Sequence, residues 1–170
     1  GKVKIDGVVR KSLHHAIGLM DVIELENVSD IYRLVPTEGK ILKPIKINES
    51  EKSKKLVRVV TKTSINKETT QTGFHDGRST LAEVKAGVGD TCVMQIPDQK
   101  ILDIIKLEAG CQGLVVRGIN AGQIGKVESV EEGTFILPKR VILILGDKKI
   151  EIPADIIMPI GKEEPVIQLK

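Results

Sequence analysis

His75 and Asp76 are adjacent, and a histidine beside a carboxylate is the kind of pair that transfers protons in acid–base catalysis. Such a pair also needs a nucleophile or a leaving group in a sheltered pocket, and the sequence contains no nucleophile motif. Gly77 follows directly, and Asp-Gly is typical of a two-residue β-hairpin turn. If the turn has two residues, His75 and Arg78 face each other across the hairpin. The sequence therefore favours turn formation over catalysis at this position.

Metal and thiol chemistry have little support. His14 and His15 are adjacent, so their side chains point in different directions on any regular element. Cys92 and Cys111 each lack a second cysteine at metal-ligand spacing. Lone cysteines of this kind are usually small, buried hydrophobic residues. We therefore expect no catalytic residue, no metal ligand and no cofactor.

The segment 114–130 reads LVVRGINAGQIGKVESV and contains three glycines, at 118, 122 and 125. Each interior glycine costs a helix about 1 kcal/mol relative to alanine, so a strand, a glycine-rich turn and a second strand are predicted instead. A Walker phosphate loop is excluded, because Asn120 stands where it requires a glycine and Val127 where it requires serine or threonine. A dinucleotide fingerprint is excluded as well, because no glycines at positions one, three and six open a helix.

The same segment resembles the KOW motif, a β-hairpin of small SH3-like barrels found in ribosomal proteins and transcription elongation factors. The resemblance implies RNA or RNA polymerase as the partner. The loop positions that would reach RNA are Arg117, Asn120, Gln123 and Lys126. About half of such residues are expected to serve only the turn, because phosphate contacts need few side chains.

Charge is distributed unevenly along the chain. The net charge is +3, but residues 40–67 contain nine basic and two acidic residues, so this basic segment carries +7 and the rest of the chain −4. Its basic residues are Lys40, Lys43, Lys46, Lys52, Lys54, Lys55, Arg58, Lys62 and Lys67. The asymmetry indicates a polyanionic partner, and a solvated surface is the alternative. Arg58 and Lys62 share one face of their strand if no bulge intervenes, and we expect both to contact phosphates.

The composition limits the other possibilities. Hydrophobic residues make up 41% of the 170, which suffices for a core in one domain or two small ones. Aromatic residues make up only 2%, so base stacking on aromatic side chains is not expected to dominate. No apolar run approaches the roughly 20 residues of a membrane span. The chain begins with Gly1, has no visible signal peptide, and is expected to be a truncated or processed product.

Short apolar runs separated by turn residues predict a mostly β chain of two small antiparallel barrels with no long helix. Asp6-Gly7 predicts a hairpin over residues 2–10, and Asn48 is the expected N-cap of a short helix. The remaining predicted strands are 19–25, 31–35, 40–47, 56–65, 91–96, 100–107, 134–137, 141–145 and 149–152.

Five stretches together carry a wider resemblance. They are Gly18–Ile23, His75–Arg78, Ile101–Glu108, Leu114–Val127 and Ile160–Lys162. In this order they resemble the archaeal and eukaryotic small-subunit ribosomal proteins of the eS-four family, and the similarity covers almost the whole chain.

The resemblance implies a structural constituent of the cytoplasmic small ribosomal subunit. Its implied partners are small-subunit rRNA and neighbouring ribosomal proteins, with no enzymatic activity, small-molecule substrate or membrane. It implies a remnant of the N-terminal RNA-binding module and connector at residues 1–24, a central β domain at 25–108 and a KOW SH3-like barrel with a C-terminal tail at 109–170. Off the ribosome we expect a monomer.

The residues expected to contact RNA are Arg58, Lys62, His75, Arg78, Arg117, Asn120, Gln123 and Lys126. The alternative function is a KOW module of a transcription elongation factor that docks on RNA polymerase through an exposed apolar barrel face. The basic segment favours rRNA, because its side chains would neutralise phosphates.

Overall fold

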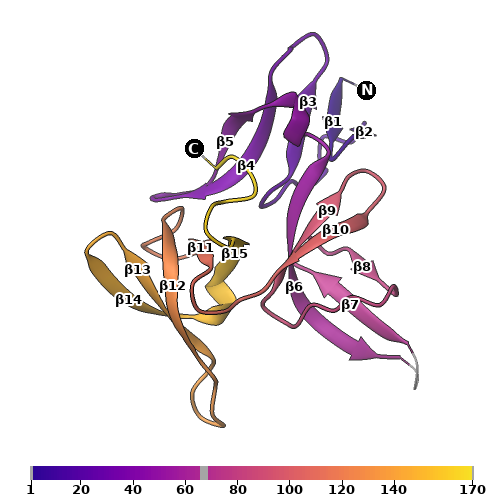
Figure 1. The fold of residues 1–170 in the computed structure, drawn as a ribbon. Helices are drawn as coiled ribbons and strands as arrows, with labels where there is room; N and C mark the ends of the chain where they lie inside the picture. Colours follow the sequence, from indigo (N-terminus) through magenta and orange to yellow (C-terminus); the bar gives the residue numbers. More distant parts are fainter. Residues whose placement is uncertain (1, 66–68, 170) are drawn as a thin grey trace.

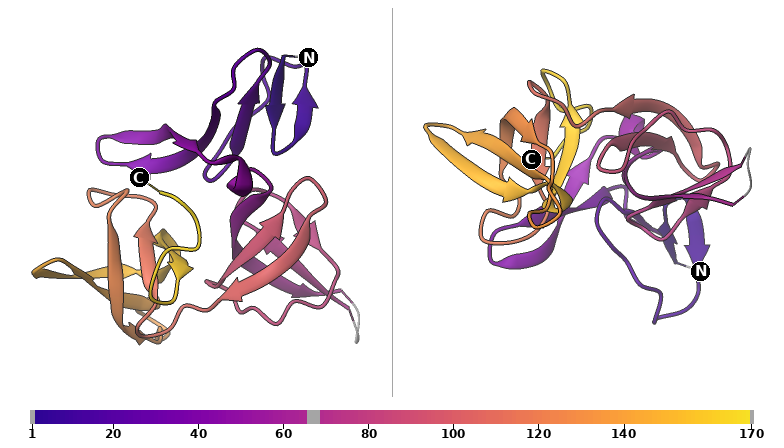
Figure 2. Two further views of the ribbon diagram at one scale, coloured as in Figure 1. Left: turned by 45° about the horizontal axis from the view of Figure 1, so that its top comes forward. Right: turned by 90° about the horizontal axis from the view of Figure 1, so that it is seen from below.

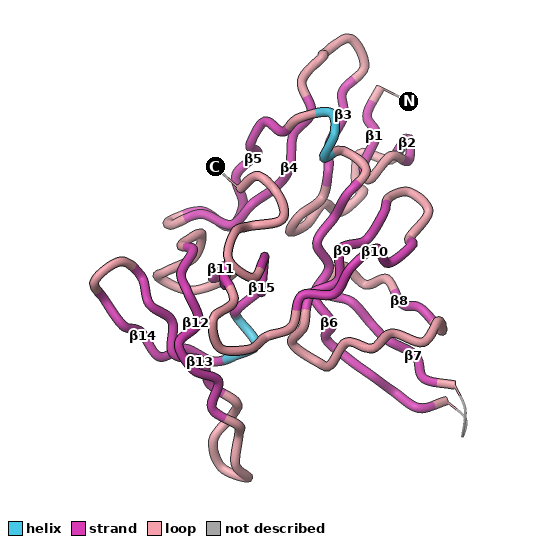
Figure 3. Tube along the Cα trace, in the orientation of Figure 1, coloured by secondary structure: helices cyan, strands magenta, loops and turns pink. Residues whose placement is uncertain are grey.

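The structure is a computed structural model that describes residues 2–65 and 69–169, and nearly all of its regular structure is β-strand (Figures 1 and 3). The strands form three antiparallel sheets of five strands each, so the predicted mostly β, antiparallel fold is confirmed. Two short 3-10 helices, η1 (Glu49–Glu51) and η2 (Ala154–Ile156), complete the regular structure. Asn48 precedes η1 as predicted, but its side chain makes no capping hydrogen bond.

The first sheet has the strand order β2-β1-β3-β4-β5. Its strands are β1 (Val3–Ile5), β2 (Val8–Arg10), β3 (Val22–Leu25), β4 (Ile31–Thr37) and β5 (Lys40–Ile47). Asp6 and Gly7 have φ of +51° and +76°, which is the predicted two-residue turn. β1 also pairs with β3, so the N-terminal hairpin forms an edge of this sheet, and the predicted boundary after residue 24 lies inside β3.

The second sheet has the order β10-β9-β6-β7-β8. Its strands are β6 (Lys54–Ser64), β7 (Thr70–Phe74), β8 (Ser79–Thr80), β9 (Thr91–Gln95) and β10 (Lys100–Ile105). The first half of β6 pairs with β9 and the second half with β7. A β-bulge between Val59 and Thr61 shifts the alternation of side chains, so the condition under which Arg58 and Lys62 would share one face is not met.

The third sheet has the order β14-β13-β12-β11-β15. Its strands are β11 (Gln112–Val115), β12 (Ile124–Glu131), β13 (Arg140–Leu145), β14 (Lys148–Pro153) and β15 (Ile157–Gly161). The glycine-rich segment connects β11 to β12, as predicted. The strand predicted at 134–137 is wrong, because these residues form a loop beyond the end of the β12–β13 hairpin, where no strand is available for pairing. Phe135 in this loop is fully exposed.

The three sheets lie around a common centre, and the C-terminal segment runs between them (Figure 2). A single apolar cluster joins them there. It contains Met20 from the segment before β3, Leu56 and Val93 from the second sheet, Leu114 and Met158 from the third, and Ile167 from the tail. Burial of such side chains stabilises the junction by about 1.5–3 kcal/mol each. The sheets are therefore held together by apolar packing as well as by the polar contacts described below.

Both cysteines are free and buried, as expected of inert core residues. Burial raises the pKa of both thiols, that of Cys92 to about 11, which keeps them protonated near neutral pH. No helix among the described residues is long and apolar enough to span a membrane.

Candidate functional site

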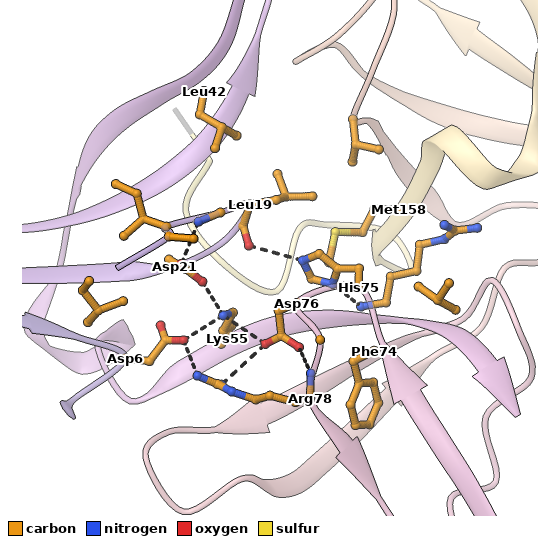
Figure 4. Close-up of a pocket in the computed structure, with 18 of the residues that line it drawn as sticks. Asp6, Leu19, Asp21, Leu42, Lys55, Phe74, His75, Asp76, Arg78 and Met158 are labelled. Carbon is orange, nitrogen blue, oxygen red and sulfur yellow. Dashed lines mark hydrogen bonds and ion pairs between the residues drawn. The ribbon is translucent and has the colours of Figure 1, made fainter. Parts of the chain in front are cut away.

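A buried charge cluster lies where the first and second sheets meet (Figure 4). Lys55 on β6 places its Nζ 2.7 Å from Asp6 Oδ2, 2.5 Å from Asp21 Oδ1 and 3.1 Å from Asp76 Oδ2. Asp6 also accepts a hydrogen bond from Arg78 Nη2 at 2.6 Å. These five residues, which we call the Lys55 cluster, tie the β1–β2 turn and the segment before β3 to β6 and to the β7–β8 loop.

The environment keeps the Lys55 cluster ionised. Burial by itself would lower the pKa of Lys55, but the charges and hydrogen bonds of Asp6 and Asp21 outweigh it, and the pKa is raised. Burial would raise the pKa of Asp76, but chiefly the Lys55 charge outweighs it, and the pKa is lowered. A buried pair of this kind is costly to break, because removing one partner leaves an uncompensated charge.

His75 is positioned by the second sheet and held in a neutral state. Its Nδ1 accepts the backbone N–H of Arg58 at 3.0 Å, so Nε2 carries the proton that it donates to Leu19 O at 3.2 Å. Burial lowers its pKa, which also favours the neutral ring. The imidazole thus joins β6 to the segment before β3.

The β7–β8 turn differs from the predicted two-residue form. The N–H of Phe74 donates to Arg78 O at 2.9 Å and that of Gly77 to Phe74 O at 3.1 Å, so the loop spans three residues. Gly77 has φ of +83°, whereas Asp76 does not adopt a positive φ. His75 and Arg78 therefore do not face each other, because the Asp76 carboxylate bonds Lys55 and the N–H of Arg78 instead of allowing the tighter turn.

Arg58 links the second and third sheets. Its Nη1 donates to Asp155 O at 2.8 Å and its Nη2 to Ala154 O at 3.1 Å, both in η2. Burial is the main cause that lowers its pKa, and the nearby positive charge of Arg117 acts in the same direction. Lys62, beyond the bulge, is exposed and its Nζ donates to Val84 O at 2.9 Å.

The glycine-rich loop packs against the first sheet. Gly118 and Gly122 have φ of +88° and +85°. A Cβ at Gly122 would lie 2.6 Å from Pro36 O, whereas one at Gly118 would lie in open space. Of the predicted loop contacts, Arg117 and Lys126 are exposed and Asn120 and Gln123 are half-buried.

The basic segment is not one uniform surface. Lys43 and Lys54 are exposed, and Lys46 and Lys52 are paired with Asp30 and Glu49. Lys55 is fully buried, so this lysine belongs neither to a surface that faces a polyanion nor to a solvated one. Lys67 and the side chain of Lys40 lie outside the described residues.

Four of the eight predicted site residues line one cavity of about 900 Å³, at the junction of the three sheets. They are Arg58, His75, Arg78 and Arg117. The other four do not line it.

Sequence reasoning missed Asp6, Asp21 and the buried Arg33, whose guanidinium bonds Glu51 and the backbone O of Lys54. One local signal was available for Arg33, a single cation within the apolar strand 31–37. The partners of Lys55 lie 49, 34 and 21 residues away along the chain, so no local pattern connects them.

The three antiparallel sheets of five strands each, the last built around the glycine-rich β11–β12 hairpin, define a multi-sheet β protein. The family model for ribosomal family S4e matches residues 28–101. Small ribosomal subunit protein eS4 of Staphylothermus marinus is 38% identical over 181 residues, which cover 99% of this chain and 71% of that protein. The eS4 protein of Methanothermobacter thermautotrophicus is 35% identical over 170 residues, covering 99% and 70%.

The structural comparison agrees. The crystal structure of 30S ribosomal protein S4e from Thermoplasma acidophilum superimposes with a TM-score of 0.81 and 29% identity, covering 95% of this chain and 81% of that one. The chain belongs to the S4e family of ribosomal proteins, and the resemblance found in the sequence is confirmed.

Proposed function

We propose that the chain is a structural, non-enzymatic constituent of the small ribosomal subunit, located in the cytoplasm, and that it binds small-subunit rRNA. The observation that carries the proposal is the 38% identity to a small ribosomal subunit protein over nearly the whole chain. The arrangement around His75 supports a structural role, because both ring nitrogens are occupied by backbone partners within the chain. A general base needs a ring nitrogen that can reach the proton it removes.

The residues expected to contact RNA fall into two groups, according to whether their side chains already have partners within the chain. Arg117 and Lys126 are exposed and make no hydrogen bond or ion pair with any described residue, so they are the strongest candidates for phosphate contact. Asn120 and Gln123, half-buried in the same loop, are assigned to hold the turn beside the RNA. Lys62 can turn toward phosphate by releasing one backbone carbonyl.

Arg58, His75 and Arg78 have partners inside the chain, and we assign them mainly to positioning. They hold the three sheets in the arrangement that presents the exposed cations. From the basic segment, Lys43 and Lys54 join the phosphate-contacting set, because both are exposed and unpaired among the described residues. Residues 109–170 form the KOW barrel in this proposal, and the preceding sheets form the rest of the rRNA-binding body.

A second candidate, docking on a protein such as RNA polymerase, is favoured by one observation. Phe135 and Ile136 at the tip of the β12–β13 loop are 106% and 86% exposed. Exposed apolar groups of this size are typical of protein contacts. Within the first proposal, the same tip would contact a neighbouring ribosomal protein.

Binding of small-subunit rRNA at several salt concentrations tests the proposal. Each lost phosphate contact lowers the slope of log affinity against log salt by about 0.7–0.9. The variant with Lys54→Gln and Lys126→Gln should therefore lose about 1.4–1.8 from the slope. A matched variant, Lys100→Gln with Lys148→Gln, removes two exposed lysines from positions outside the proposed set and should lose little. An affinity of the parent chain that does not depend on salt would contradict the proposal.

A further inference from the structure

The cavity at the three-sheet junction has the size and the wall chemistry of a ligand site. Its volume of about 900 Å³ lies within the range of small-molecule and cofactor pockets, about 300–1,000 Å³. Its apolar wall includes Leu19 from the segment before β3, Leu42 from β5 and Met158 from β15 (Figure 4). Val116, which directly follows β11, also lines it. All three sheets therefore contribute to one concave surface.

The negative charges of the cavity are already satisfied. Asp6, Asp21 and Asp76 are each ion-paired with Lys55, and Asp6 also with Arg78, within the Lys55 cluster. One further carboxylate, Asp155, lies on the wall. An incoming anion would meet this carboxylate and a cluster that carries three negative and two positive charges, so it must bind nearer the other cations.

Those other cations have no acceptor. Arg10 on β2 and Arg117 after β11 both line the cavity, and neither side chain makes a hydrogen bond or ion pair with any residue in 2–65 or 69–169. Nε of Arg10 is buried without a partner. Arg117 also lies close enough to Arg58 for the two positive charges to disfavour each other. A guanidinium near a like charge and without a carboxylate is stabilised by an added anion, and its planar set of donors matches phosphate.

The apolar wall suits the flat face of a base. Among the described residues, Phe74 is the only phenylalanine, tyrosine or tryptophan that lines the cavity, and it is 5% exposed, so stacking on its ring contributes little. Aliphatic side chains and guanidinium planes can take that place, because bases also pack on arginine. A base in a duplex must first be unpaired and unstacked, which costs free energy, whereas an unpaired base enters at a lower cost.

We propose that this cavity receives one unpaired nucleotide of an RNA strand, with its base against the apolar wall and its flanking phosphates on Arg10 and Arg117. The proposal rests on the proposed function, since it assigns a position on the chain to unpaired rRNA. It also predicts a preference for single-stranded RNA that contacts with exposed lysines alone would not give.

Binding of three probes to the whole chain tests the proposal. The probes are a single-stranded RNA octamer of mixed sequence, the same octamer paired with its complement, and adenosine monophosphate. The test variant carries Arg10→Gln and Arg117→Gln. The matched control carries Lys4→Gln and Lys148→Gln, which remove the same charge from exposed, unpartnered positions in the same two sheets outside the cavity. Methyl signals of Leu42 and Met158 report occupation of the cavity.

The single strand should bind the parent chain more tightly than the duplex and shift both methyl signals. The test variant should lose about tenfold or more in affinity for the single strand, and its slope of log affinity against log salt should fall by about 1.4. The control should lose less than about twofold in affinity. Equal losses in the test variant and the control would overturn the cavity site and leave rRNA binding standing. If adenosine monophosphate binds as tightly as the single strand, the cavity is a site for a free nucleotide. That result would overturn the proposal that it receives a nucleotide of an RNA strand. No binding of any RNA by the parent would overturn both proposals.

Discussion

Lys55 on β6 and Asp21 ahead of β3 form a buried ion pair, with Nζ and Oδ1 2.5 Å apart and side chains that are 1% and 11% exposed. The pair joins the first and second sheets through two residues that lie 34 positions apart in the sequence. Because Asp6 and Asp76 bond the same ammonium group, Lys55 is the central residue of the polar junction.

Replacing Lys55 by methionine should destabilise the chain by about 3–5 kcal/mol, because the aliphatic stem is kept but three carboxylates lose their shared cation. Lys54→Met is the control, since Lys54 is exposed on the neighbouring position. It should change the free energy of unfolding by no more than about 0.5 kcal/mol. Urea denaturation measures both. Equal effects of the two substitutions would show that the Lys55 cluster contributes nothing to the fold.

Stability should fall in acid, beginning near the pKa of an unfolded histidine. The pKa of His75 is lowered by burial, so the folded state binds its proton less well than the unfolded state. The contribution of His75 to the free energy of unfolding is complete above about pH 6.5, the pKa of an unfolded histidine. It is lost as the pH falls from there through the pKa of His75 in the folded state. His75→Gln should remove this part of the pH dependence, whereas His14→Gln, at an exposed position, should leave it. Thermal unfolding between pH 7 and pH 5 distinguishes the two variants, and an unchanged profile in His75→Gln would refute the assignment.

The Lys55 cluster sets the outer limits of pH stability. The lowered pKa of Asp76 contributes stability above the unfolded value of about 3.9, which is lost as the pH falls below it. The raised pKa of Lys55 contributes stability below the unfolded value of about 10.4, which is lost as the pH rises toward the folded pKa. Asp76→Asn should flatten the acid limb below pH 4 in urea titrations. A steeper acid limb in that variant would contradict the sign of the Asp76 shift.

The two glycines of the KOW-type loop should respond differently to alanine. Both have positive φ, so each substitution should cost about 1–2 kcal/mol from backbone conformation. Gly122→Ala should cost distinctly more, because its Cβ would lie 2.6 Å from Pro36 O and 2.9 Å from Thr37 Cα. Chemical denaturation of both variants makes the comparison. If Gly118→Ala is as destabilising as Gly122→Ala, the loop does not pack against the first sheet in this way.

Arg58 should matter more for stability than for RNA affinity. Arg58→Gln removes two hydrogen bonds to carbonyls of η2 and should cost about 1–3 kcal/mol. Lys62→Gln, on the same strand but exposed, should cost less than about 0.5 kcal/mol. Denaturation and rRNA binding measured on both variants separate the two roles. If the Arg58→Gln variant is as stable as the parent but its rRNA affinity depends less on salt, Arg58 contacts phosphate and does not mainly position η2.

Local patterns predicted the elements that local interactions determine. Asp6-Gly7 formed the expected turn, and the glycines of segment 114–130 formed the expected hairpin, because positive φ is decided within a few residues. The same dipeptide at Asp76-Gly77 gave a wider loop, because the Asp76 carboxylate is held by a lysine 21 residues away.

The missed features depend on contacts between distant residues. Lys55 stands within a run of charges typical of a solvated surface, and it becomes buried where the first and second sheets meet. The run at 134–137 is apolar enough for a strand but extends beyond any pairing partner. The bulge in β6, which separates Arg58 from Lys62, likewise arises where one strand changes partners from β9 to β7.

Sedimentation with isolated ribosomal subunits tests the central claim most directly. The purified chain is mixed with small or large subunits in high salt, with the Lys54→Gln, Lys126→Gln variant alongside the parent. The parent is predicted to sediment with small subunits and not with large ones, and the variant to be released at a lower salt concentration because it retains fewer phosphate contacts. Equal sedimentation of the parent with both subunits, or with neither, would contradict the claim that this chain binds the small ribosomal subunit.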